Sequence, residues 1–137
     1  MSNTFEILAR GRCFNGNWYE GDMQHLRNGD VVIRPKDSTD GLGYYVDPQT
    51  VSVFVQRTDK NGKHVFVGDI CRLKGVIADT GESYDELFCV GFDSKSCMFS
   101  IDGNYAEFLP SKEEFFEECE VVGNKWDNPE LMSGGAK

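Results

Sequence analysis

The feature that most constrains the fold is a pair of short apolar runs that meet at a turn. Valines recur at every second residue from Val51 to Val55, and a second alternating run covers residues 64–67. This period of two is typical of a strand with one buried face. The segment 59–63 between the runs contains Asn61-Gly62, a pair that favours a tight turn. We therefore expect a β-hairpin with Val51, Val53 and Val55 on its buried face.

Similar signals recur along the chain. Asn15-Gly16 and Asn28-Gly29 each follow an apolar run, and Pro35 ends the third one. The segments 37–43 and 79–86 are polar and predict loops. The expected strands are residues 5–14, 17–26, 31–33, 51–56, 65–67, 87–92, 96–101, 105–109 and 121–122, with a further strand entered at 68–71.

One helix is expected near the C-terminus. Ser111 follows Pro110 and precedes Glu114 by three residues, which is a capping box. Phe115 and Phe116 would form the buried side of this helix. The chain is thus predicted to be mainly β, a hairpin-rich small barrel similar to SH3-like barrels, with one short C-terminal helix.

The length of 137 residues suits one domain. We expect a single domain over residues 1–132, with an N-terminal hairpin region at 1–45 and a central and C-terminal region at 46–132, followed by a flexible tail at 133–137. No apolar run approaches the ~20 residues of a membrane span, and no signal peptide is evident, so we expect a cytoplasmic location. The five cysteines predict reduced, mostly buried thiols.

The net charge of −9 is concentrated in the second half. Residues 1–75 carry 9 acidic and 10 basic side chains, whereas residues 76–137 carry 14 and 4. Such a surface disfavours direct nucleic-acid binding and attracts a basic protein. An acidic face that only aids solubility is the alternative. The candidate partner-binding residues are Glu82, Asp85, Glu86, Glu113, Glu114, Glu117, Glu118 and Trp126.

Catalytic, metal and cofactor sites find little support in the sequence. The turn at 59–63 does not match a calcium loop, because its glycine comes at the fourth position instead of the sixth. Asp22 and Asp69 could form a pair of catalytic carboxylates, but aspartate after glycine more often shapes a turn. The cysteines and histidines lack zinc-site spacing, and a Cys71 and His64 nucleophilic pair would need a local setting. We expect no catalytic residue, metal or cofactor.

Three blocks of the sequence stand in a recognisable order. The first is the aromatic and Gly-Asp segment 15–22, and the last comprises residues 120–124 and 128–131. The central block contains Asp47, Pro48, Thr50, Val51, Asp59, Asn61, Gly62, Lys63, Gly68, Asp69 and Ile70. In these blocks the chain resembles the YopX family, small proteins of phages and prophages. Between Ser52 and Arg57 it departs from the Gly-Gln-aromatic-Thr-Gly run that is usual in that family.

The resemblance implies a phage or prophage accessory protein. The leading hypothesis is non-enzymatic binding of a host or phage macromolecule through the acidic surface, with inhibition of a nucleic-acid-handling or anti-phage defence complex as one form of that role. The alternative is an oligomeric protein that sequesters a small ligand such as a nucleotide signal. The third is an enzyme of unknown type. A homo-oligomer is compatible with each of them.

Overall fold

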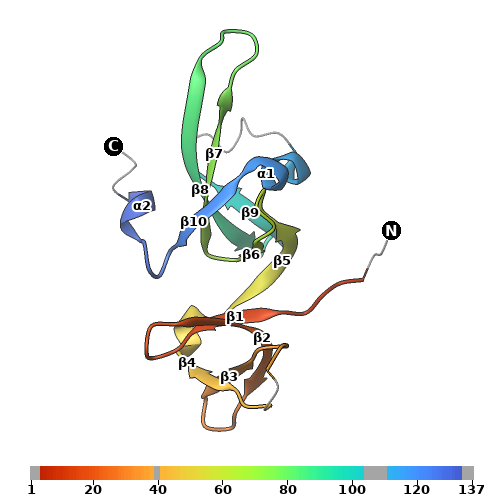
Figure 1. The fold of residues 1–137 in the computed structure, drawn as a ribbon, viewed down its shortest axis with the longest axis vertical. Helices are drawn as coiled ribbons and strands as arrows, with labels where there is room; N and C mark the ends of the chain where they lie inside the picture. The colour runs from red at the N-terminus through yellow and green to blue at the C-terminus, as the bar shows by residue number, and fades with distance from the viewer. Residues whose placement is uncertain (1–3, 39–40, 104–110, 134–137) are drawn as a thin grey trace. The chain divides into compact units, whose positions relative to one another are not determined.

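The computed structural model describes residues 4–38, 41–103 and 111–133. It divides the chain into two compact units, Met1–Gln56 and Arg57–Lys137. Figure 1 shows the elements of each unit along the chain. The expectation of one domain over residues 1–132 stays a prediction.

The first unit is an antiparallel sheet with the strand order β4-β3-β2-β1-β5. The Asn-Gly turns form as expected, with Gly16 at φ +95° and Gly29 at φ +96°, a backbone conformation that glycine adopts without strain. Its core contains Ala9, Val31, Ile33 and Val46. The elements are β1 (Ala9–Arg12), β2 (Trp18–His25), β3 (Val31–Arg34), β4 (Tyr44–Val46), the 3-10 helix η1 (Pro48–Thr50) and β5 (Ser52–Thr58), whose last residues belong to the second unit.

The second unit contains an antiparallel sheet with the order β10-β7-β8-β9. The helix α1 (Lys112–Glu118) packs on this sheet, as the edge-on contact between the Phe115 and Phe88 rings shows, with 5.5 Å between the ring centroids. Both rings are almost fully buried. The elements are β6 (His64–Phe66), β7 (Asp69–Val76), β8 (Ser83–Asp93), β9 (Met98–Asp102), α1 (Lys112–Glu118), β10 (Glu120–Asn124) and α2 (Glu130–Ser133).

The predicted fold class is confirmed: the chain is mainly β, although its two antiparallel sheets do not close into a barrel. The predicted capping box is also confirmed. The Glu114 N–H donates to Ser111 Oγ at 3.2 Å, and the Ser111 hydroxyl donates to Glu114 Oε1 at 3.3 Å. Phe115 and Phe116 are buried as expected. The sequence did not predict β4, η1 or α2.

The expected face of the central strand is wrong. Val53 is 50 % exposed, whereas Phe54, Val55 and Ser52 are buried. The alternation breaks where Phe54 and Val55 are both buried, next to Gln56, whose φ of +71° takes the backbone out of the extended conformation. On β6 Val65 and Phe66 are both buried, so alternation fails there as well.

The loop was predicted at residues 79–86, but its C-terminal part belongs to the next strand. β7 continues to Val76 and β8 begins at Ser83, so the connection covers only residues 77–82. The predicted strand at 105–109 lies outside the described residues, as does most of the predicted tail. Ser133 ends α2.

Candidate functional site

Asp47, in the central block, shapes a backbone turn. Its carboxylate accepts a hydrogen bond from the Gln49 N–H at 3.1 Å and so caps η1. The Thr50 hydroxyl donates to the Asp47 carbonyl at 2.7 Å and accepts from the Arg12 N–H at 2.9 Å. Thr50 is 1 % exposed. These two residues therefore join η1 to β1.

Asp59 is a buried hydrogen-bond acceptor for backbone groups far apart in sequence. Its Oδ1 accepts from the N–H groups of Asn61 and Lys63, both at 2.9 Å. Its Oδ2 accepts from the Val121 N–H on β10 at 2.9 Å. Burial alone would raise the pKa of Asp59, but these three donors and the nearby Lys63 charge lower it below the ordinary value. The carboxylate thus fastens the 59–63 turn to β10.

Gly68 and Asp69 are also held inside the second unit. Gly68 has φ +97°, and a Cβ there would lie 2.5 Å from a ring carbon of Trp126. The Gly68 N–H donates to the Val90 carbonyl at 2.7 Å. Asp69 is fully buried, and its Oδ2 accepts from the Phe66 N–H at 2.8 Å. Trp126, predicted as an anchor for a partner, therefore packs on the backbone at Gly68.

The last block forms a loop closed by two asparagines. Asn124 Oδ1 accepts from the N–H groups of Trp126 and Asp127, at 3.0 and 2.9 Å. Asn128 Oδ1 accepts from the Asn124 N–H at 3.2 Å. Since the central and last blocks use their polar side chains on backbone groups, the recognisable residues mainly explain the fold.

Four of the predicted partner-binding residues lie on α1 and are exposed: Glu113, Glu114, Glu117 and Glu118. They form what we call the α1 acidic face. Glu113 and Glu114 lie in the first turn, where the helix dipole stabilises a negative charge. Glu117 and Glu118 lie at the other end, which has no basic residue in its last turn and where the dipole disfavours them.

The other predicted acidic residues lie on and beside β8. The Arg72 guanidinium forms a two-bond ion pair with Asp85, with Nε 2.8 Å from Oδ1. This hydrogen bond, against a smaller effect of desolvation, lowers the pKa of Asp85. Lys74 lies directly opposite Asp85 across the β7–β8 pair. Glu86 is half-buried, and Glu82 is exposed in the connection before β8. Asp85 is therefore already neutralised by a residue that the sequence argument missed.

Arg72 could have been found from the hairpin register. Once the connection is centred on residues 77–82, β7 and β8 align so that Lys74 faces Asp85 and Arg72 lies diagonally beside it. The predicted loop at 79–86 hid this relation because it removed Asp85 from the strand.

The structure describes the surroundings of each residue that was considered for catalysis. Asp22 is exposed on β2 in the first unit, whereas Asp69 is buried in the second. His64 is half-buried beside the Phe66 ring. Cys71 is fully buried, and its hydrogen bond with Cys119, together with burial, raises its pKa and disfavours a thiolate.

The thiols are reduced, but fewer are buried than predicted. Cys71 and Cys119 are buried, Cys13 and Cys89 are half-buried, and Cys97 is exposed. Among residues 4–38, 41–103 and 111–133, no cluster of three His, Cys, Asp or Glu side chains could hold a metal ion. Within the same residues, no helix has the length and apolar character needed to cross a membrane.

Three comparisons relate the chain to other proteins. A search of curated proteins finds no match. Protein EF1440 from Enterococcus faecalis, known from a crystal structure, is similar with a TM-score of 0.60 and 15 % sequence identity, over 95 % of this chain and 100 % of that one. At this identity the similarity shows the fold alone. The family model described as "YopX protein" matches residues 34–133, and the chain therefore belongs to the YopX family.

Proposed function

We propose that this chain is a non-catalytic phage or prophage accessory protein whose α1 acidic face binds a basic surface of a host or phage protein. The observation that carries the proposal is the separation of the two sides of α1. Phe115 and Phe116 are buried in the unit, while all four glutamates are exposed on the other side. Since Glu117 and Glu118 oppose the helix dipole, helix stability does not account for them.

The charge of the second unit supports the same partner. Residues 57–137 carry 16 acidic and 9 basic side chains, a net charge of −7. Such a field accelerates association with a basic protein and repels nucleic acid, and it is screened beyond about 8 Å at physiological salt. A protein that binds nucleic acid in a groove has a basic surface there, which is the kind of surface that the acidic field would attract. Inhibition of a nucleic-acid-handling or defence complex would follow from occupying that groove.

The experiment is a pull-down from a bacterial lysate with two matched variants. The test variant carries Glu113→Gln, Glu117→Gln and Glu118→Gln, and keeps Glu114 because it belongs to the capping box. The control variant carries Asp79→Asn, Asp93→Asn and Glu130→Gln, three exposed acidic residues elsewhere in the unit. We expect a partner that is lost with the test variant, retained with the control, and released by added salt. Partners that respond equally to both variants would contradict the proposal.

The small-ligand alternative has less support. It needs basic and aromatic side chains open to a ligand, and the candidates lie in the first unit. There the Trp18 ring is already covered by the chain's own cations, with the guanidinium carbon of Arg10 at 4.8 Å and that of Arg12 at 5.8 Å. Arg10 is itself only 8 % exposed.

A further inference from the structure

The N-terminal edge segment, residues 5–8, lies alongside β5 but does not form a regular strand. The register of β1 with β5 pairs Ala9 with Val53 and Arg10 with Ser52. The hydrogen bond from the Phe54 N–H to the Leu8 carbonyl, 3.1 Å long, continues this register. One more step of the same register places Glu6 opposite Gln56.

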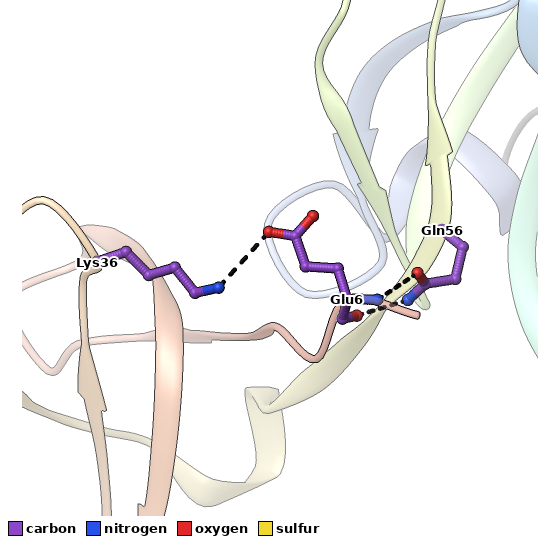
Figure 2. A network of polar contacts seen from close by, with 3 residues as sticks. All are labelled: Glu6, Lys36 and Gln56. Carbon is purple, nitrogen blue, oxygen red and sulfur yellow. Dashed lines mark hydrogen bonds and ion pairs between the residues drawn. The ribbon is translucent and has the colours of Figure 1, made fainter. Parts of the chain in front are cut away.

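At Gln56 the side-chain amide, instead of the backbone N–H and C=O, makes the hydrogen bonds to Glu6. Its Oε1 accepts from the Glu6 N–H at 2.9 Å, and its Nε2 donates to the Glu6 carbonyl at 2.7 Å (Figure 2). An antiparallel hydrogen-bonded pair exchanges the same two bonds through backbone groups. The amide is needed because Gln56 has φ +71°, which turns its own peptide away from the ladder.

This pairing fixes the direction of the remaining backbone groups. In an extended chain, the N–H and C=O of successive residues point alternately to the two edges of the strand. Glu6 and Leu8 bond toward β5, so Phe5 and Ile7 direct their backbone groups to the opposite edge. Their side chains are 66 % and 79 % exposed, whereas Leu8 is 5 % exposed.

Among the described residues of the first unit, the opposite edge is open. The β1–β2 pairing ends at Ala9 and Gly21, and β2 pairs with β3 from Asp22 onward. No described strand pairs with residues 5–8 on that side. An exposed edge with apolar side chains is a template for strand addition.

We propose that a second copy of this chain adds to this edge, antiparallel and about a two-fold axis that passes beside Glu6. The segment is complementary to itself in that arrangement. Phe5 lies opposite Ile7 of the second copy on both sides of the axis, and these two pairs exchange four N–H···O bonds. Closed two-fold dimers require such a self-complementary patch.

The charge at the axis is compatible with the pairing. Two Glu6 side chains would face each other, and like charges directly opposite are destabilising. Each is accompanied by its own cation, since Lys36 Nζ lies 3.6 Å from Glu6 Oε2 (Figure 2). A strand from another protein would need apolar residues opposite Phe5 and Ile7, and a second copy of this chain provides them as its own Ile7 and Phe5.

The first experiment is sedimentation velocity across a concentration series. An interface of this kind is small, so we expect a dimer that forms at about 100 μM or below. Ile7→Lys should weaken association by at least about tenfold, because it places a cation on the edge. Phe14→Lys is the matched control, since Phe14 is 74 % exposed in the same unit but outside the segment. A monomeric wild-type protein at 100 μM, or equal effects of the two variants, would overturn the proposal.

The second experiment tests the register, in a Cys97→Ser background that removes the exposed native thiol. A residue on the axis faces its own copy at a Cβ separation of about 4.5–5.5 Å, close enough for a disulfide. Glu6→Cys should therefore give a covalent dimer under mild oxidation by diamide. Ile7→Cys should give much less, because Ile7 faces Phe5 of the second copy. Equal cross-linking of the two variants would contradict the two-fold pairing about Glu6, and so would cross-linking confined to Ile7→Cys.

Discussion

Replacing Asp59 by asparagine tests whether this carboxylate holds the second unit together. The side chain is 5 % exposed and accepts from three backbone N–H groups, at Asn61, Lys63 and Val121. The amide nitrogen of Asn cannot accept, so either the two turn donors or the Val121 donor loses its acceptor. The remaining bonds also lose their charge assistance.

The magnitude follows from the number of bonds affected. A hydrogen bond to a charged group contributes about 1.5–3 kcal/mol, and a buried donor left unsatisfied costs about 1–3 kcal/mol. We therefore expect Asp59→Asn to lower the free energy of unfolding by about 2–4 kcal/mol at pH 7. Asp59→Ala, which leaves all three donors without the carboxylate, should lower it further.

The effect has a defined pH dependence. The pKa of Asp59 is lowered in the folded state, so its contribution to stability is present above the unfolded pKa, about 3.9. It is lost as the pH falls through the lower folded pKa. The difference between wild-type protein and Asp59→Asn should therefore shrink at acid pH.

Urea denaturation between pH 7 and pH 3 measures this difference, and amide hydrogen exchange locates it. Protection should fall at Val121 or at Asn61 and Lys63 in the Asn variant. A loss below about 0.5 kcal/mol at pH 7 would refute the reasoning, because surface substitutions have effects of that size. A difference that grows toward acid pH would refute the assigned direction of the pKa shift.

Three further predictions concern single sites. Gln56→Ala should lower the free energy of unfolding by about 1–2 kcal/mol, because two exposed hydrogen bonds to Glu6 are lost. Gln56→Gly should be about 1 kcal/mol more stable than Gln56→Ala in urea denaturation, because it relieves the strain at φ +71°; the opposite order would show that the strain is absent. Gly68→Ala should lower the free energy of unfolding by more than about 2 kcal/mol and shift the fluorescence of Trp126, because the Trp126 ring lies 2.5 Å from the added Cβ position. An unchanged spectrum with full stability would contradict this contact. Arg72→Ala should leave the urea denaturation midpoint nearly unchanged, because its ion pair with Asp85 is exposed, and a clearly lower midpoint would indicate a further role for Arg72.

Local signals in the sequence predicted local structure well. The Asn-Gly turns and the Ser111 capping box depend on residues within a few positions of one another, so a short window contains all the partners. The central strand was harder. Its valines suggested one face, but Gln56 interrupts the alternation, and its partner Glu6 is 50 residues away.

The position and exposure of the α1 acidic face followed in part from the sequence, whereas its role in binding stays a prediction. Composition placed the acidic excess in the second half, and the buried Phe115 and Phe116 indicated which side of α1 is exposed. The neutralisation of Asp85 by Arg72 depended on the register of two strands, which the misplaced loop boundary concealed.

The sequence by itself determined the family, most of the succession of strands and turns, and the uneven distribution of charge. These properties follow from residue type and short-range spacing. Only the tertiary structure decided what the family residues do, because Asp59 meets the Val121 N–H 62 positions away and Gly68 meets Trp126 through a chain reversal. It also decided that Asp85 pairs with Arg72, since pairing across a sheet depends on register and not on composition.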